Sequence, residues 1–281
     1  MINTPAKIKC VYNNRMVLPG AGKGPGLWKA APVVNAIRAA GGFEFTERSP
    51  ALSENTLCVA HNLSYVLDVL AGRVPNGHGD KDGAVLATVL IQAAGFVYAS
   101  ELAAAIRGPV FSPTAGFHHA GYAYGGGACT FNALMIAALL HVRIHKTQAL
   151  IVDGDAHFGD GCVDIINRKL PGTAGVRYIS TSDRDRPEEF IESCRREISH
   201  HEGLVLYQPG ADCLEMDSMG DGNYTVEQFD RRDRAVFEAC KARQLAVVWN
   251  LAGGYGAPTM KETIEAHVRT CMTALEVYGP A

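Results

Sequence analysis

The stretch ALIVDGDAHFGDG, residues 149–161, decides which fold to expect. Its first part, residues 149–153, is an apolar run that ends in an aspartate. Continuous rather than alternating apolarity is typical of a strand covered on both faces, as in a parallel sheet. Glycines and polar residues follow at once, so that three carboxylates and one histidine fall within residues 153–160. We therefore predict a buried strand whose carboxyl end leads into a functional loop.

The rest of the chain repeats this pattern of buried runs and periodic segments. Similar apolar runs occupy residues 7–12, 108–111, 176–181, 204–207 and 246–251. Helical periodicity predicts helices over residues 31–40, 62–71, 83–94, 132–145, 187–200, 225–242 and 259–278. Strands that alternate with helices predict an α/β domain with a mostly parallel sheet. In such sheets ligands bind outside the carboxyl ends of the strands.

Composition excludes several classes of protein. Of the 281 residues, 47% are hydrophobic and 20% charged, which is typical of a globular chain and not of a disordered one. The net charge of −3 shows no basic excess, so we expect neither nucleic acid nor a membrane as partner. The eight cysteines form no CxxC pair, which argues against a zinc ribbon. The most apolar stretch, residues 84–100, is short for a membrane span, and we expect a cytoplasmic protein.

Asp155, His157 and Asp212 are the candidate metal ligands. Residues 153, 155 and 157 of an extended segment share one face, so Asp155 and His157 can offer oxygen and nitrogen to one ion. Asp212 comes shortly after the apolar run 204–207. An oxygen, nitrogen, oxygen set with an open fourth position is the composition of a catalytic zinc site. The alternative interpretation is a pair of acidic loops with helix caps and solvated charges.

Two further groups could take part in catalysis. His118 and His119 follow the run 108–111 next to a glycine turn and could be two acid/base groups or two surface residues. Tyr255 lies between glycines after the run 246–251, so it could donate a hydrogen bond to an oxyanion or simply pack over a turn. The other adjacent pair, His200 and His201, lies among charged residues, and we interpret it as a solvated helix end.

Together these motifs resemble the zinc-dependent histone deacetylase family, including its bacterial members that act on acetylpolyamines and other amides. The segments that carry the resemblance, in order, are HNLSYV at 61–66, HHAG at 118–121, GACTFN at 127–132, DGDAHFGDG at 153–161, GAD at 210–212 followed by Asp217, and LAGGYG at 251–256. The resemblance implies the arginase–deacetylase fold, with an eight-stranded parallel sheet between helical layers. It also implies that residues 1–281 form one catalytic domain.

The resemblance assigns a role to each candidate site residue. It implies that zinc is bound by Asp155, His157 and Asp212, and that Tyr255 polarises the substrate carbonyl. It pairs His118 with Asp153 and His119 with Asp160. It further implies a structural potassium ion near Asp153, Asp155 and His157, with help from Ser180.

The chain departs from the family pattern where the substrate would be held. Ala128, after Gly127, stands where the family has the phenylalanine of Gly-Phe-Cys, and no facing aromatic residue is evident after Ser180. Phe158 replaces a histidine of the family pattern, and Met219 is expected near the rim of the pocket. The family segment His-Pro-Glu-x-Pro-x-Arg is missing near the N-terminus, where residues 26–29 read GLWK. The chemistry is therefore better supported than the substrate.

The predicted function is zinc-dependent hydrolysis of an N-acyl amide, of the acyl-lysine, acetylpolyamine or another small-molecule type. Metal-activated water, a histidine pair and an oxyanion-stabilising tyrosine are what this reaction needs. One alternative is an arginase-like dimetal ureohydrolase, which would need further bridging carboxylates and a histidine near residue 255. The other alternative is a binding protein that has kept the fold and lost turnover.

Overall fold

A central parallel sheet organises the chain in the computed structural model, which describes residues 7–18, 20, 24–48, 51–169, 175–181, 186–220, 222–256 and 260–279. Within these residues the sheet has seven strands in the order β2-β1-β3-β7-β6-β4-β5, and every neighbouring pair is parallel. The strands are β1 (Ile8–Val11), β2 (Phe43–Thr46), β3 (Pro109–Phe111), β4 (Gln148–Asp153), β5 (Val176–Ser180), β6 (Gly203–Gln208) and β7 (Ala246–Trp249). The predicted α/β class is confirmed, with one strand fewer than the family resemblance implies.

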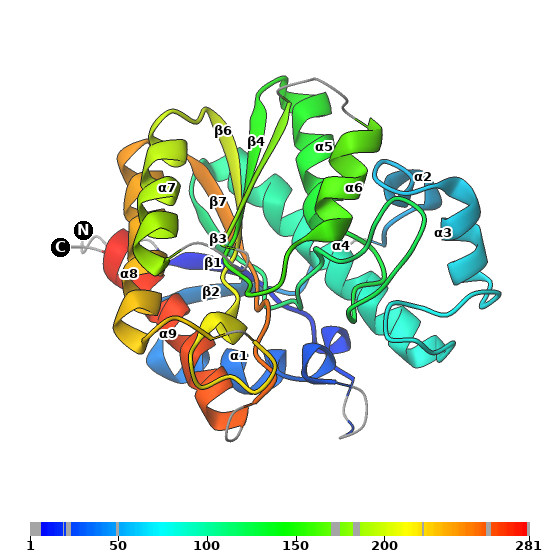
Figure 1. The fold of residues 1–281 in the computed structure, drawn as a ribbon, viewed down its shortest axis with the longest axis horizontal. Coiled ribbons are helices and arrows are strands. Elements are labelled where there is room, and N and C mark those ends of the chain that lie inside the picture. Colours follow the sequence, from blue (N-terminus) through cyan, green and yellow to red (C-terminus); the bar gives the residue numbers. More distant parts are fainter. Residues whose placement is uncertain are drawn as a thin grey trace.

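Helices cover both faces of the sheet (Figure 1). One face is covered by α4 (Gly83–Ile106) and α5 (Ala133–His145), with α6 (Asp160–Lys169) beside them. The other face is covered by α8 (Val226–Ala242) and α9 (Met260–Tyr278), with α7 (Pro187–Ser199) and α1 (Ala30–Ala40) packed against them. Two short helices, α2 (Glu54–Leu57) and α3 (Leu63–Leu70), pack against each other to one side.

The register of the sheet brings the candidate site together. Asp153, the last residue of β4, pairs with Ser180 of β5 and with Gln208 of β6. On the other side, Trp249 of β7 pairs with Tyr207 of β6 and with Phe111 of β3. The strands therefore end at about the same level, and the polar segments that follow them meet at one edge.

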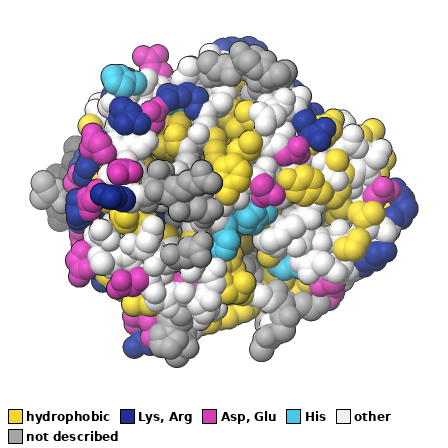
Figure 2. Space-filling model, in the orientation of Figure 1, with side chains coloured by type: hydrophobic (Ala, Val, Ile, Leu, Met, Phe, Trp, Pro, Cys, Tyr) yellow, Lys and Arg dark blue, Asp and Glu magenta, His cyan; other side chains and the backbone are white. Residues whose placement is uncertain are grey.

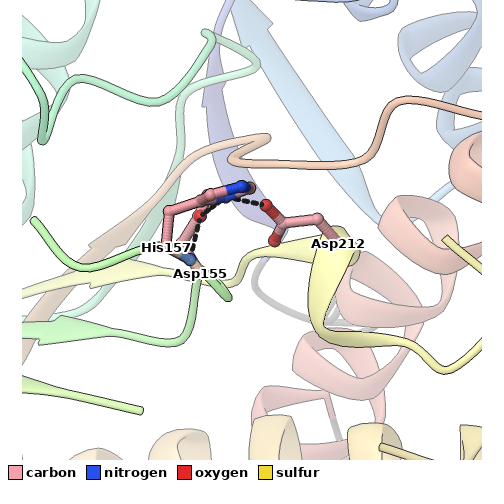
Figure 3. A group of neighbouring side chains, drawn as sticks. All are labelled: Asp155, His157 and Asp212. Carbon is pink, nitrogen blue, oxygen red and sulfur yellow. Dashed lines mark hydrogen bonds and ion pairs between the residues drawn. The ribbon is translucent and has the colours of Figure 1, made fainter. Parts of the chain in front are cut away.

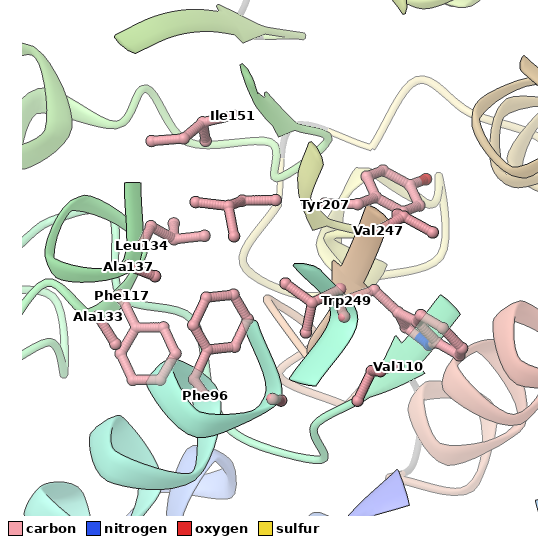
Figure 4. Close-up of a cluster of buried hydrophobic side chains, with 14 of the residues drawn as sticks. Phe96, Val110, Phe117, Ala133, Leu134, Ala137, Ile151, Tyr207, Val247 and Trp249 are labelled. Carbon is pink, nitrogen blue, oxygen red and sulfur yellow. The ribbon is translucent and has the colours of Figure 1, made fainter. Parts of the chain in front are cut away.

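The hydrophobic core lies between the sheet and its helices. Figure 4 shows Phe96 of α4, Phe117 and Leu134 packed toward Ile151 of β4. The indole ring of Trp249 is fully buried and stacks on Phe111, with ring centroids 5.1 Å apart. This packing fixes the strands that carry the site at their ends.

Several elements differ from the sequence-based predictions. The strand β2 and the helices α2 and α6 were not predicted, and α4 extends to Ile106 instead of ending at residue 94. With 24 residues, α4 is long and apolar enough to cross a membrane by composition alone, and the estimate of a short apolar stretch was wrong. The helix packs on strands of the sheet, and 61% of its most apolar window is buried in the protein.

The interpretation of His200 and His201 as a solvated helix end was half wrong. His200 caps α7 and is exposed, as expected. His201 is fully buried, and its Nε2 lies 3.1 Å from the carbonyl oxygen of Leu204. The chain turns back into β6 directly after α7, and this turn carries the second histidine inward.

Candidate active site

Three predicted metal ligands converge at the carboxyl edge of the sheet (Figure 3). Asp155 and His157 follow β4, and Asp212 lies in the short 3-10 helix Ala211–Cys213 after β6. The Nδ1 atom of His157 lies 3.1 Å from Asp155 Oδ1 and 2.9 Å from Asp212 Oδ2. One ligand atom from each of the three side chains lies within 4.8 Å of the others. This spacing and donor set fit a single small cation.

Two glycines allow the ligand-bearing loops to approach so closely. A Cβ atom on Gly210 would lie 2.2 Å from the Cα atom of Asp155. Gly253 has a φ of +57°, and a Cβ there would lie 2.2 Å from Asp212 Oδ1. Any larger residue would push the loops apart, so glycine at both positions holds the ligands together.

The electrostatics of the three side chains favour a cation between the carboxylates. Asp155 and Asp212 are both buried, and burial together with the Asp155 carboxylate raises the pKa of Asp212 to about 7. Hydrogen bonds to Asp155 and Asp212 raise the pKa of His157 to about 11. Two buried carboxylates that face one another need a compensating positive charge. Their oxygen and nitrogen donors match the ligand preferences of Zn²⁺.

The pair of His118 and Asp153 forms the buried wall of the site. His118 Nδ1 donates to Asp153 Oδ2 at 2.8 Å, as the family resemblance implied. Asp153 also accepts hydrogen bonds from Tyr178 Oη at 2.7 Å and Gln208 Nε2 at 3.0 Å, which fix its orientation. Burial alone would lower the pKa of His118, but the Asp153 and Asp155 carboxylates raise it to about 9.

The second pair, His119 and Asp160, lies closer to solvent. His119 Nδ1 donates to Asp160 Oδ1 at 2.7 Å, which leaves Nε2 as an acceptor. The ring of His119 is 4.1 Å from that of His118 and 6.0 Å from that of His157, measured between centroids. Burial and the neighbouring His118 lower the pKa of His119, which favours the neutral form of the ring.

Tyr255 faces the metal ligands from the loop after β7. Its ring packs edge-on to His157 with centroids 6.0 Å apart. Its backbone N–H donates to Asp217 Oδ2 at 2.8 Å, so the acidic residue after the GAD motif holds the loop in place. Burial and the Asp155 and Asp212 carboxylates raise the pKa of the Tyr255 phenol, which stays protonated and able to donate.

A cavity of about 60 Å³ lies in front of these groups. Its lining includes His118, His119, Asp155 and Tyr255. The predicted pocket residues Gly127 and Ala128 also line it. Phe158 and Met219 are 46% and 64% exposed and are not among the described residues that line it. Figure 2 shows histidine side chains near the middle of this face, with hydrophobic side chains beside them.

Lys29 lines the same cavity, although the sequence alone assigns it no role. Its Nζ atom donates to the carbonyl oxygen of Gly253, and the side chain is buried. Burial lowers its pKa to about 8 against the opposing effect of the nearby carboxylates. The one sequence signal for Lys29 is its place in the segment GLWK, which stands where the family motif is missing. Its partner Gly253 lies 224 residues further along the chain.

Two expectations about this region stay predictions. Asp153 and Ser180, expected near a potassium ion, are register partners on β4 and β5, but no described contact identifies the ion. The segment after Ser180, where the family has a facing aromatic residue, includes residues 182–185, which lie outside the described part of the chain.

Comparison with known proteins agrees with this geometry. The family model of the histone deacetylase domain matches residues 29–190 and 182–271, which include every site residue from His118 to Tyr255. Among curated proteins, Histone deacetylase 2 of Arabidopsis thaliana is 26% identical over 197 residues. The match covers 58% of this chain and 48% of that protein, so the chain spans about half the length of this curated relative. Since the family model covers most of its length, the chain belongs to the histone deacetylase family.

Proposed function

We propose that this protein is a zinc-dependent amidohydrolase that cleaves the C–N bond of an N-acyl amide. The observation that carries the proposal is that three metal-ligating side chains lie together beside two His–Asp pairs and a tyrosine. Four of these residues, His118, His119, Asp155 and Tyr255, line one cavity. A zinc ion on Asp155, His157 and Asp212 would supply Lewis acidity to the amide carbonyl and to the attacking water. Membership in a deacetylase family supports the same class of reaction.

The side chains of the chain itself would handle the protons and the developing charge. Asp160 fixes the tautomer of His119, so Nε2 can take the proton of the attacking water and pass it to the leaving amine. The Tyr255 hydroxyl would donate to the oxyanion as the carbonyl carbon becomes tetrahedral. His118, held by the buried Asp153 and adjacent to His119, would help to stabilise the developing negative charge.

The test is hydrolysis by protein that has been stripped with a chelator and reloaded with zinc. The panel contains acetyl-lysine peptides, acetylpolyamines and small N-acyl amides, and the released amine is measured. We expect turnover of at least one class, lost on stripping and restored by zinc. Full zinc occupancy without turnover on the whole panel would favour the binding-protein alternative.

A dimetal ureohydrolase has less support. Within the described residues, one group of three ligating side chains lies close enough to share an ion, and it provides no ligands for a second metal. Release of urea from a guanidinium substrate would favour this alternative over the proposed amidohydrolase.

The two histidines are expected to differ in their effect on catalysis. Replacing His119 by alanine should lower kcat by about 10²-fold, because it removes the group that moves the proton. His118→Ala should lower kcat less, and both variants should keep their zinc, since neither residue belongs to the ligand set. Steady-state kinetics with metal analysis tests this, and a clearly larger loss of kcat in His118→Ala would reverse the roles.

The substrate is proposed to be bulkier than acetyl-lysine. Ala128 lines the cavity where the family has a ring, and a missing ring removes up to about 150–250 Å² of contact with an acyl-lysine stem. Ala128→Phe should raise kcat/KM on acetyl-lysine peptides by about tenfold, or roughly 1.4 kcal/mol of contact, and lower it on bulkier amides.

A control separates this pocket effect from backbone strain. Ala128 has a φ of +61°, which lies in the left-handed region. This conformation is less favourable for a residue with a side chain than for glycine. Ala128→Gly relieves the strain without filling the pocket, so the substrate preference should stay unchanged.

If the unmodified protein already turns over acetyl-lysine peptides with kcat/KM above about 10⁴ M⁻¹s⁻¹, the idea of a bulkier substrate is wrong.

A further inference from the structure

Arg232 on α8 is a fully buried cation just behind the two metal-ligating loops. Its Nη1 atom donates to the carbonyl oxygen of Gly154 at 3.0 Å and to that of Gly210 at 3.2 Å. Gly154 immediately precedes Asp155, and Gly210 lies two residues before Asp212. One guanidinium nitrogen therefore bridges the loops after β4 and β6 directly beside their metal ligands.

The guanidinium group is itself held rigidly from several sides. Its Nε and Nη2 atoms both donate to Asp233 Oδ1, at 3.0 Å and 2.8 Å. The other oxygen of Asp233 accepts from the Thr270 hydroxyl of α9 at 2.5 Å. The ring of Phe229 lies 4.3 Å from the guanidinium carbon. A planar fork with this many partners cannot shift without breaking several contacts.

The absence of a side chain at Gly154 leaves room for this close approach. A Cβ atom at Gly154 would lie 3.0 Å from Arg232 Nη1, a tight contact that would displace the guanidinium by a few tenths of an ångström. On the side of the sheet, the N–H groups of Gly154 and Gly210 both donate to the carbonyl oxygen of Gln208. The two loops are thus tied together by Gln208 on one side and by Arg232 on the other.

We propose that Arg232 is a positioning residue that sets the spacing between Asp155 and Asp212, and thereby the affinity of the site for zinc. The inference rests on the proposed zinc site, but it concerns metal binding and is independent of which amide is hydrolysed. Groups that orient metal ligands from behind typically change metal affinity by about 10–100-fold when they are replaced.

The experiment compares zinc affinity in Arg232→Lys, Gly154→Ala and Val236→Ala, by competition with a chromophoric chelator. Lysine keeps the charge but lacks the fork that reaches both loops and Asp233 together. Gly154→Ala displaces the same contact without removing the buried charge, so it serves as the test if Arg232→Lys does not fold. Val236 is a buried residue of the same helix and is the matched control for general loss of stability.

We expect the Kd for zinc to rise by about 10-fold or more in Arg232→Lys and Gly154→Ala. In Val236→Ala the Tm should fall while the Kd stays within about twofold of the wild-type value. Wild-type affinity in both test variants, or an equal loss in Val236→Ala at a similar Tm, would overturn the positioning role. If the wild-type protein binds zinc but hydrolyses no amide, the proposed function fails and the role of Arg232 stands; if it binds no zinc, both fail.

Discussion

Asp155→Ala and His157→Ala should each lose zinc and amide hydrolysis together. Each change leaves only two of the three converging ligands. The loss of zinc affinity should therefore exceed the roughly 10–100-fold loss that is typical when a residue that orients the ligands is replaced. Metal analysis after zinc loading and dialysis measures occupancy, and the panel of N-acyl amides measures activity. Zinc at 100 times its Kd should stabilise the wild-type protein by about 2.7 kcal/mol, and this stabilisation should vanish in both variants.

The control for this prediction is an acidic residue of the same region that holds no metal. Asp164 on α6 accepts from the side chain of Arg168 at 2.8 Å and from the backbone N–H of Tyr122 at 2.8 Å. Asp164→Asn should keep both its zinc and the rise of Tm on zinc binding. Full zinc occupancy in both Asp155→Ala and His157→Ala would show that the ligands have been assigned wrongly.

The part of the fold that the sequence predicts is the part buried on both faces. Residues 149–153, 204–207 and 246–251 read as continuous apolar runs because successive residues of β4, β6 and β7, which point to opposite faces of the sheet, are buried. Their polar ends then had to meet, since parallel strands in register end at one edge. Positions at the strand ends therefore predict the metal ligands, whereas the two His–Asp pairs follow from the resemblance to the family.

The elements that were missed lack such a signal. The edge strand β2 has only four residues, and three of its side chains are half-buried or exposed. Helix α6 begins at Asp160, inside a glycine-rich stretch whose composition predicts a loop. Lys29 and Arg232 are single charged residues whose contacts with Gly253 and Gly154 span 224 and 78 residues, so no local pattern distinguishes them from surface cations. Only the folded chain shows that both are buried, Lys29 in the lining of the cavity and Arg232 behind the metal-ligating loops.

Tyr255→Phe should lower kcat by about 10²–10³-fold while zinc content stays the same. The change removes one hydroxyl, the proposed donor to the oxyanion, and a loss of this size is typical of a single such donor. The position of the residue should not change, because Asp217 holds its backbone N–H and its ring keeps the contact with His157. Steady-state kinetics on the best substrate, metal analysis and a melting curve together test these statements.

Tyr65→Phe provides the matched control, because it also removes one hydroxyl from a buried tyrosine. The Tyr65 hydroxyl donates to the carbonyl oxygen of Thr130 at 2.7 Å, and Tyr65 is not among the described residues that line the cavity. Its loss should cost about 1 kcal/mol of stability and leave kcat unchanged. The two variants should therefore show opposite patterns, since Tyr255→Phe affects the rate and Tyr65→Phe the stability. An unaltered kcat in Tyr255→Phe would mean that Tyr255 only packs against His157, and that the oxyanion is stabilised by other groups.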